Sequence, residues 1–163
     1  MKKFVVISDT HIPKRAKELP PKVLKEIERS DGIIHAGDFV SYDFYLFLEK
    51  NFLIHAVHGN MDEPMLFSFL PETKIFEIEN LKIGLFHGIG APVGIEERVL
   101  KKFKNENLDL IIFGHSHRVF NKKIGNTHLF NPGSACDKFF STVNTFGLIK
   151  VNGKNFEIEV IKV

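Results

Sequence analysis

The fold is decided by residues 3–11, Lys3-Phe4-Val5-Val6-Ile7-Ser8-Asp9-Thr10-His11. Residues 3–8 form a compact apolar run, which predicts a strand buried on both faces of a sheet. The run ends in Asp9 and His11, two side chains of types that bind metal ions. In extended backbone, residues two apart face the same side, so this pair can reach one metal ion or two adjacent ions.

The same pattern recurs four times further along the chain: a β-type run ends in Asp, Asn or His, with a glycine close by. These segments are His35-Ala36-Gly37-Asp38, His58-Gly59-Asn60-Met61-Asp62, His87-Gly88 and Gly114-His115-Ser116-His117. Ligands of open α/β sheets bind in the crevice at the carboxyl ends of the strands. We therefore expect all five loops to meet at one place.

The side chains of these loops combine imidazole nitrogen with carboxylate and amide oxygen, and they include no thiolate. This combination indicates a site for Mn, Fe, Co or Zn, and it does not fit a structural zinc site rich in cysteine. A carboxylate such as Asp38 can bridge two ions, which lie about 3.5–4 Å apart in phosphatases and nucleases. One Asp or Asn after a strand is more often a turn former, but such residues in five successive loops favour a metal site.

The remaining pattern predicts short strands alternating with amphipathic helices in the first half of the chain, and a strand-rich second half. Helices are expected from Pro20-Pro21 onward, from an N-cap at Ser41 to residue 50, and over residues 94–104. Further strands are expected at 32–35, 52–57, 74–78, 81–86, 109–113, 118–124, 127–130, 142–151 and 155–161. Asn152-Gly153 predicts a type I′ turn between the last two strands. No element is predicted over residues 64–71.

Length and composition predict one globular domain spanning residues 1–163, and the pattern of strands and helices predicts that it is an α/β domain. The chain is 44% hydrophobic and 26% charged, which excludes a disordered chain, and no apolar run reaches the roughly 20 residues of a membrane helix. Asp9 interrupts the first apolar run too early for a signal peptide. The single cysteine, Cys136, allows no internal disulfide and predicts a cytoplasmic location.

The net charge and the number of phenylalanines indicate which partners are expected and which residues fill the core. The net charge of +2 is too even for a protein that coats nucleic acid, so a long nucleic acid is not an expected partner and neither is a membrane. The 17 phenylalanines, among them Phe44, Phe47, Phe139 and Phe140, mostly fall in apolar runs and are expected to fill the core.

Six sequence blocks carry a family resemblance that covers almost the whole chain. They are Asp9-Thr10-His11, Gly37-Asp38, Gly59-Asn60-Met61-Asp62, His87-Gly88, Gly114-His115-Ser116-His117 and Asn131-Pro132-Gly133-Ser134. In this order the blocks resemble the calcineurin-like metallophosphoesterase superfamily, and most closely its small YfcE-type phosphodiesterase branch. The resemblance implies an α/β fold in which two mixed β-sheets form a sandwich flanked by helices.

The resemblance also implies a dinuclear centre with Asp38 as the bridge. One ion would be held by Asp9, His11, Asp38 and His117, and the other by Asp38, Asn60, His87 and His115. Asp38, Asn60 and His87 are accordingly the expected catalytic residues. Relatives are often most active with manganese, so Mn is the expected metal, with Zn, Fe, Ni, Co and Mg as alternatives.

The implied reaction is the hydrolysis of a small phosphodiester. A metal pair lowers the pKa of a shared water, and the resulting bridging hydroxide attacks phosphorus in line with the leaving oxygen. Many larger members of the superfamily carry a histidine after the Asn, and it helps to protonate the leaving group. Met61 occupies that position here and cannot donate a proton, so rates should depend strongly on the pKa of the leaving group.

Several side chains near the ligand loops are candidates for other roles. His58 and Arg118 are candidate substrate-binding residues, Lys14 and Arg15 could bind a phosphate oxygen, and His35 could support the Gly37-Asp38 turn.

A scaffold is the main alternative function. The same fold occurs in a eukaryotic retromer subunit that resembles these enzymes but serves mainly as a scaffold. A protein-binding scaffold that retains the metal site needs an apolar docking patch. Candidates for such a patch are Phe39, Phe44, Tyr45, Phe139 and Phe140. A nuclease or cyclic-nucleotide hydrolase is a further alternative, and assembly into a homo-oligomer is left open by the sequence.

Overall fold

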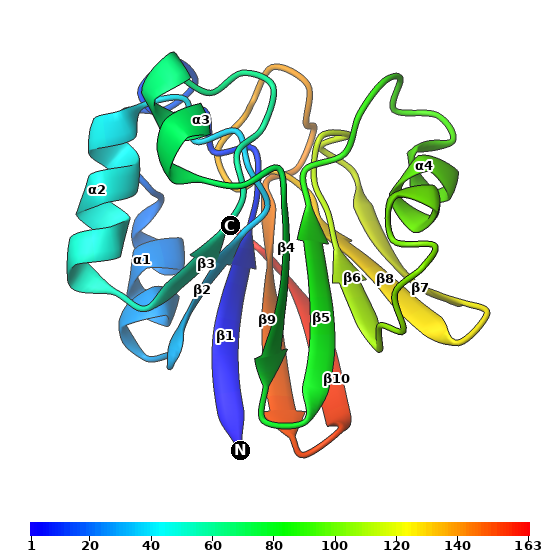
Figure 1. Cartoon of the computed structure of the whole chain (residues 1–163). Coiled ribbons are helices and arrows are strands. Elements are labelled where there is room, and N and C mark those ends of the chain that lie inside the picture. The colour runs from blue at the N-terminus through cyan, green and yellow to red at the C-terminus, as the bar shows by residue number, and fades with distance from the viewer.

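The computed structural model describes residues 1–163 and contains two mixed β-sheets of five strands each, packed face to face and flanked by helices (Figure 1). The helices are α1 (Pro21–Glu28), α2 (Tyr42–Asn51), α3 (Pro64–Phe69) and α4 (Ile95–Lys102). The strands are β1 (Lys2–Ile7), β2 (Gly32–His35), β3 (Ile54–Ala56), β4 (Thr73–Ile78), β5 (Leu81–Phe86), β6 (Leu110–Ile112), β7 (Val119–Ile124), β8 (Thr127–Pro132), β9 (Thr145–Asn152) and β10 (Asn155–Lys162). The predicted sandwich of two mixed sheets is confirmed.

The first sheet has the strand order β10-β9-β1-β2-β3. Strands β1, β2 and β3 are parallel, and Phe4 of β1 pairs with Gly32 of β2. Strand β9 is antiparallel to β1, and β10 is antiparallel to β9. Strand β2 is buried along its whole length and β1 is buried over its last four residues, because both faces of these two strands are covered.

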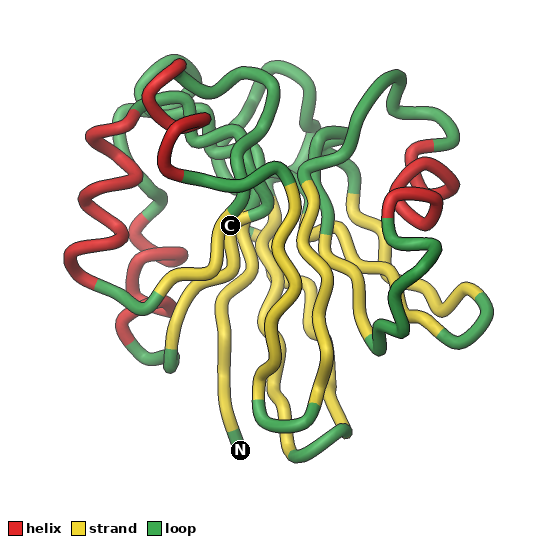
Figure 2. Tube along the Cα trace, viewed as in Figure 1, coloured by secondary structure: helices red, strands yellow, loops and turns green.

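The second sheet has the strand order β4-β5-β6-β8-β7. Strands β5, β6 and β8 are parallel, while the two edge strands β4 and β7 are antiparallel to their neighbours. The carboxyl ends of β1, β2, β3, β5 and β6 therefore reach the same edge of the sandwich. The longer loops gather at this edge, at the top of Figure 2.

Three apolar layers hold the sandwich together. The layer between the sheets includes Phe4, Val6, Ile83, Leu110 and Phe130. Helices α1 and α2 cover the outer face of the first sheet, and α4 covers the outer face of the second (Figure 1). The burial of each large apolar side chain in these layers stabilises the fold by about 1.5–3 kcal/mol.

Local sequence accounts for the start of helix α2. The Ser41 hydroxyl accepts a hydrogen bond from the Phe44 backbone N–H at 3.3 Å, as expected of an N-cap. Helix α3 was not predicted, because its six residues bury only Leu66 and show no apolar face. None of the four helices combines the length and the apolar content needed to cross a membrane.

The turn predicted between the last two strands is of a different type. Asn152 pairs with Asn155, so the two loop residues are Gly153 and Lys154, and only Gly153 has a positive φ, of 63°. A type I′ turn requires positive φ at both central residues, whereas type II′ requires it at the first alone. The type I′ prediction is therefore wrong by one residue, and the glycine occupies the first central position.

Candidate metal centre

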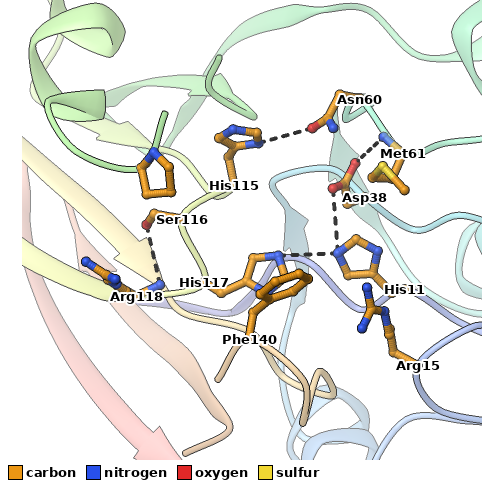
Figure 3. Close-up of a pocket in the computed structure, with 11 residues that line it drawn as sticks. His11, Arg15, Asp38, Asn60, Met61, His115, Ser116, His117, Arg118 and Phe140 are labelled. Atoms are coloured by element: carbon orange, nitrogen blue, oxygen red, sulfur yellow. Dashed lines mark hydrogen bonds and ion pairs between the residues drawn. The ribbon is translucent and has the colours of Figure 1, made fainter. Parts of the chain in front are cut away.

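The structure brings the seven predicted metal ligands together at the loop-rich edge of the sandwich. Five of them, His11, Asp38, Asn60, His115 and His117, are visible around one pocket in Figure 3. Each comes from the loop predicted to carry it: Asp9 and His11 follow β1, Asp38 follows β2, Asn60 follows β3, His87 follows β5, and His115 and His117 follow β6.

One group of donor atoms surrounds Asp9. Its carboxylate oxygen Oδ1 lies 3.1 Å from Nε2 of His117, and that nitrogen lies 3.4 Å from Nε2 of His11. His11 Nε2 is also 3.6 Å from Oδ2 of Asp38. The donor atoms of Asp9, His11 and His117 all lie within 4.8 Å of one another, close enough to hold one ion.

A second group of donor atoms surrounds Asn60. Its side-chain oxygen lies 3.1 Å from Nε2 of His87 and 3.1 Å from Nδ1 of His115. The same nitrogen of His87 is 3.3 Å from Oδ2 of Asp38. Asp38 Oδ2 therefore faces both groups.

The chemistry of these groups fits divalent metal ions. Asp9 Oδ1 is fully buried and accepts no hydrogen bond. A buried carboxylate oxygen without a donor is costly, and a cation in contact with it removes that cost. The surrounding donors are imidazole nitrogens and side-chain oxygens, which suit Mn, Fe, Co and Zn. The residues present therefore fit the predicted metal centre.

Backbone conformation sets the ligand loops apart from the rest of the chain. Seven non-glycine residues have positive φ, and five of them are predicted ligands: Asp9, His11, Asp38, His115 and His117, with φ between 47° and 69°. A non-glycine residue in this region costs about 1–3 kcal/mol. Such strain persists where the surrounding structure fixes the loop, and it is typical of functional sites.

Two glycines allow the ligand loops to approach one another. A β-carbon at Gly59 would lie 2.5 Å from the backbone nitrogen of Asp38, and one at Gly114 would lie 2.8 Å from Oδ2 of Asp9. Both distances are shorter than real carbon contacts, so any larger residue would push the Asp38 or Asp9 carboxylate out of place.

His35 supports the turn that carries Asp38, in agreement with its predicted role. The backbone N–H of Gly37 donates to His35 Nδ1 at 3.1 Å, and His35 Nε2 lies 3.0 Å from the Thr10 hydroxyl. The ring stacks on Phe39 with centroids 3.5 Å apart. Burial keeps the pKa of His35 well below its usual value, so the ring is neutral and can accept the Gly37 N–H.

Asp62 ties two ligand loops together. One of its oxygens accepts hydrogen bonds from the N–H groups of Gly59 and Asp38 at 2.7 and 3.2 Å, and the other accepts from Val40 at 2.6 Å. Burial raises the pKa of Asp62 to about 6, although the backbone hydrogen bonds oppose this shift. Asp62 thus fixes the positions of Asp38 and Asn60 without facing the centre itself.

The protein without metal holds a balance of charge at the centre. Burial alone would raise the pKa of Asp9, but His117, whose Nε2 lies 3.1 Å from Oδ1, and the charge of His87 hold it well below its usual range. Burial alone would lower the pKa of His87, but Asp38 and Asp9 raise it to about 9. Protonated histidine next to buried carboxylates supplies the positive charge that a metal ion would otherwise provide.

A cavity of about 330 Å³ opens onto the centre. Besides five of the predicted metal ligands, the cavity is lined by Arg15, Met61, Pro92, Ser116, Arg118 and Phe140. Arg118, a predicted substrate-binding residue, is therefore at the cavity. His58 is not among the lining residues, because its ring packs against Phe67 with centroids 4.3 Å apart. Substrate binding by His58 remains a prediction without support from this position.

Asp137 was missed by the sequence analysis. It is completely buried, and its Oδ2 lies 2.8 Å from Nδ1 of His117. An acidic residue between Ala135-Cys136 and Phe139-Phe140 is unusual, because apolar surroundings disfavour an unpaired charge. An acidic residue among apolar ones was therefore the feature of the sequence that could have identified Asp137.

The likeness of this chain to known proteins covers nearly its whole length. Residues 1–154 match the model of the calcineurin-like phosphoesterase superfamily domain. The chain is 33% identical over 157 residues to a protein of Methanothermobacter thermautotrophicus described as a probable metallophosphoesterase. This match covers 96% of the chain and 90% of the relative.

Two solved structures share the fold. Vps29 from Entamoeba histolytica, in complex with Zn²⁺, is 27% identical with a TM-score of 0.77, and the match covers 98% of each chain. A protein described as a novel archaeal phosphodiesterase is 25% identical with a TM-score of 0.74, and the match covers 98% of this chain and 99% of the other.

Proposed function

Because this chain belongs to the calcineurin-like phosphoesterase superfamily, we propose that it is a metal-dependent phosphoesterase, and specifically a phosphodiesterase with a dinuclear metal centre. One observation carries the proposal: the donor atoms form two groups that meet at Asp38 Oδ2, which lies 3.6 Å from His11 Nε2 and 3.3 Å from His87 Nε2. The likeness to an archaeal phosphodiesterase supports a diester substrate.

The proposed ligands of the first ion are Asp9, His11, Asp38 and His117, and those of the second are Asp38, Asn60, His87 and His115. Two bound divalent ions would supply a hydroxide nucleophile near neutral pH and would neutralise charge on the phosphoryl oxygens. Manganese is the metal we propose for this chain. The zinc complex of the Entamoeba Vps29 makes zinc the first alternative to test.

The chain fixes the direction of its two central histidines through backbone carbonyls. His87 Nδ1 donates to the carbonyl of Ala36 at 2.7 Å, so Nε2 points toward Asn60 and Asp38. His115 Nε2 donates to the carbonyl of Gly90 at 2.6 Å, so Nδ1 points toward Asn60. A hydrogen bond on the remote nitrogen sets both the tautomer and the ring orientation of a metal-binding histidine.

The leaving group receives no proton from residue 61. Met61 lines the cavity and is 47% exposed, but a thioether has no proton to donate. Its backbone N–H instead donates to Asp38 Oδ1 at 2.8 Å and so orients that carboxylate. A substrate with a stable leaving group, such as a diester with an aryl or similarly acidic alcohol, therefore suits this site best.

Two guanidinium groups are available for the non-bridging phosphate oxygens. Arg15 and Arg118 line the cavity on either side of His117 and Phe140 (Figure 3). A guanidinium binds two oxygens of one phosphate in a fixed geometry, which would orient a small phosphodiester over the donor atoms.

The single cysteine, Cys136, supports a cytoplasmic location for this activity, because it forms no disulfide.

The direct test compares an aryl phosphodiester with the matched aryl monoester, using protein stripped of metal and then supplied with Mn²⁺. We expect no turnover before Mn²⁺ is added, and faster hydrolysis of the diester than of the monoester afterwards. Equal turnover with and without metal would reject the proposal. A faster monoester reaction would keep the metal chemistry but reject the diester assignment.

A scaffold is the second candidate function, and the exposed aromatic side chains beside the centre favour it. Phe139 and Phe140 are 76% and 66% exposed, so the prediction that they fill the core is wrong, as it is for Phe47. The other predicted patch residues, Phe39, Phe44 and Tyr45, are buried and cannot dock a partner. Stoichiometric metal binding without turnover on any phosphoester would favour the scaffold.

A further inference from the structure

Asp137 is a completely buried carboxylate whose two oxygens serve two different side chains of the cavity wall. Its Oδ2 lies 2.8 Å from Nδ1 of His117. Its Oδ1 accepts the backbone N–H of Phe139 at 2.7 Å and lies 3.8 Å from a guanidinium nitrogen of Arg15. Oδ2 of Asp137 and Nδ1 of His117 are both buried without a hydrogen-bond partner, so the 2.8 Å contact between them is a charge contact and not an aligned hydrogen bond.

The loop holds this carboxylate in a fixed position. The Asp137 backbone N–H donates to the Ser134 hydroxyl at 3.0 Å, and that hydroxyl donates to the Asp9 carbonyl at 2.7 Å. The Asp137 carbonyl accepts from the Asn144 side chain at 2.7 Å. Asp137 is thus anchored on both sides and linked through Ser134 to the loop that carries Asp9.

His117 lacks the backbone carbonyl partner that orients His87 and His115. His87 and His115 each donate from the remote nitrogen to a backbone carbonyl, of Ala36 and Gly90 respectively. The remote nitrogen of His117 faces Asp137, while its Nε2 faces Asp9. A carboxylate acceptor raises the basicity of an imidazole ligand more than a carbonyl does, because it carries a full charge.

We propose that Asp137 is a positioning residue that keeps the proton of His117 on Nδ1, directs Nε2 toward the metal centre, and holds Arg15 at the cavity. The part that concerns the metal rests on the proposed function. Arg15 is the second group that Asp137 positions, and its guanidinium also lies over the rings of Phe139 and Phe140, 4.8 and 5.1 Å from their centroids. One buried carboxylate would therefore act on both metal affinity and substrate binding.

The decisive variant is Asp137→Asn, which keeps the size of the side chain. The amide oxygen must accept the N–H of Phe139, so the amide NH₂ turns toward His117. An NH₂ donor at Nδ1 favours the proton on Nε2, the tautomer that cannot bind a metal. We expect Mn²⁺ affinity to fall about 10–100-fold, measured by titration calorimetry on metal-stripped protein.

A second readout separates a change in the centre from a loss of fold. The absorption spectrum of the Co²⁺-loaded protein reports the ligands and geometry of the ion, and we expect it to change in Asp137→Asn. The thermal midpoint of the metal-free variant should stay within a few degrees of the wild type. An Asp137→Asn protein that folds, binds Mn²⁺ as tightly as the wild type and keeps its Co²⁺ spectrum would overturn the proposal.

The matched control is Asp109→Asn. Asp109 also accepts a backbone N–H, that of Lys82 at 2.9 Å, but it contacts none of the proposed ligands. The Asp109→Asn substitution should leave Mn²⁺ affinity unchanged. An equal loss of Mn²⁺ affinity in this control would show that the effect of Asp137→Asn is unspecific. A wild-type protein that binds no divalent metal would instead reject the proposed function, and the metal part of this proposal with it.

The proposed role of Arg15 in substrate binding is tested with a separate variant. Arg15→Met removes the guanidinium but keeps a long side chain over Phe139 and Phe140. We expect KM for the aryl diester to rise about tenfold with Mn²⁺ affinity unchanged, because a charged hydrogen bond to phosphate is lost. Asp137→Asn should show both defects. An unchanged KM in Arg15→Met would remove Arg15 from the proposal.

Discussion

Among single residues, Asp38 contributes most to the proposed centre. Its Oδ2 faces His11 and His87, and its Oδ1 is held by the backbone N–H of Met61 at 2.8 Å. Its backbone has a φ of 59°, which aspartate tolerates better than most residues. The conformation thus directs one carboxylate to both groups of donors.

Replacing Asp38 should abolish activity without unfolding the protein. In Asp38→Ala we expect turnover of an aryl diester to fall by about 10³-fold or more, because both proposed ions would lose a ligand. The positive φ costs alanine about 1–2 kcal/mol of stability, which a folded domain tolerates. The measurements are initial rates and thermal unfolding, with Asp38→Asn as the variant that keeps the shape. A folded, metal-depleted Asp38→Ala protein with wild-type turnover would contradict the proposed role.

Met61 leads to a prediction about leaving groups. Without a proton donor at this position, the rate should fall steeply as the leaving-group pKa rises. Met61→His should make the dependence shallower and should speed up poor substrates most. A series of substituted aryl diesters measures both slopes. The same shallow slope in the wild type and the variant would show that Met61 has no influence on departure of the leaving group.

At the scale of secondary-structure elements, the two sheets are joined by aromatic contacts away from the centre. His55 of β3 stacks on Phe76 of β4 with ring centroids 3.9 Å apart and an interplanar angle of 8°. Its Nδ1 is buried without a partner, and burial lowers the pKa of His55 to about 4. The ring is therefore neutral and structural.

The His55 contact should make the fold sensitive to acid. The unfolded chain binds a proton at His55 below a pKa of about 6.5, whereas the folded chain binds it only near 4. Stability from this group is therefore lost as the pH falls from about 6.5 to 4. Because the ring is only partly buried, solvent screening leaves about 1–2 kcal/mol of this effect.

Urea unfolding at pH 7 and pH 5 measures that loss. His55→Phe keeps the stacking and has no proton to bind, so its stability should change less between the two pH values than that of the wild type. An identical loss in the two proteins would assign the acid sensitivity to other groups.

Elements with a strong local signal were predictable from the sequence, and those set by tertiary packing were not. Strand β2 matches its predicted bounds, and the cap at Ser41 is confirmed, because an apolar run and a hydroxyl before a helix act locally. Helix α3 buries only one of its six residues, so its sequence shows no amphipathic pattern that would predict a helix. The ligand loops were predictable from their position after strands, but the role of Asp137 depends on a contact with a loop 20 residues away in the chain, at His117.

At the scale of the whole molecule, the proposed centre spans both sheets. Loops of the first sheet supply Asp9, His11, Asp38 and Asn60, and loops of the second supply His87, His115 and His117. Each proposed ion would take ligands from both sheets. Metal binding should therefore hold the two sheets together at this edge of the sandwich and favour the folded state.

Thermal unfolding tests this coupling. A ligand at 100 times its Kd stabilises the folded state by about 2.7 kcal/mol, which for a chain of this size raises Tm by roughly 5–10 °C. We expect Mn²⁺ to raise the Tm of the wild type by this amount, EDTA to reverse the rise, and Asp38→Ala to show little of it. An equal rise in Asp38→Ala would place the binding of Mn²⁺ elsewhere on the molecule.

Catalysis by the proposed centre needs two ions in one site, and the rate of aryl diester hydrolysis against Mn²⁺ bound per chain tests this requirement. Metal-stripped protein is titrated at concentrations far above Kd, and bound Mn²⁺ is counted in the same samples. We expect activity to saturate at two ions per chain, with little activity before the second ion binds. Full activity at one ion per chain, or no activity at two, would contradict it.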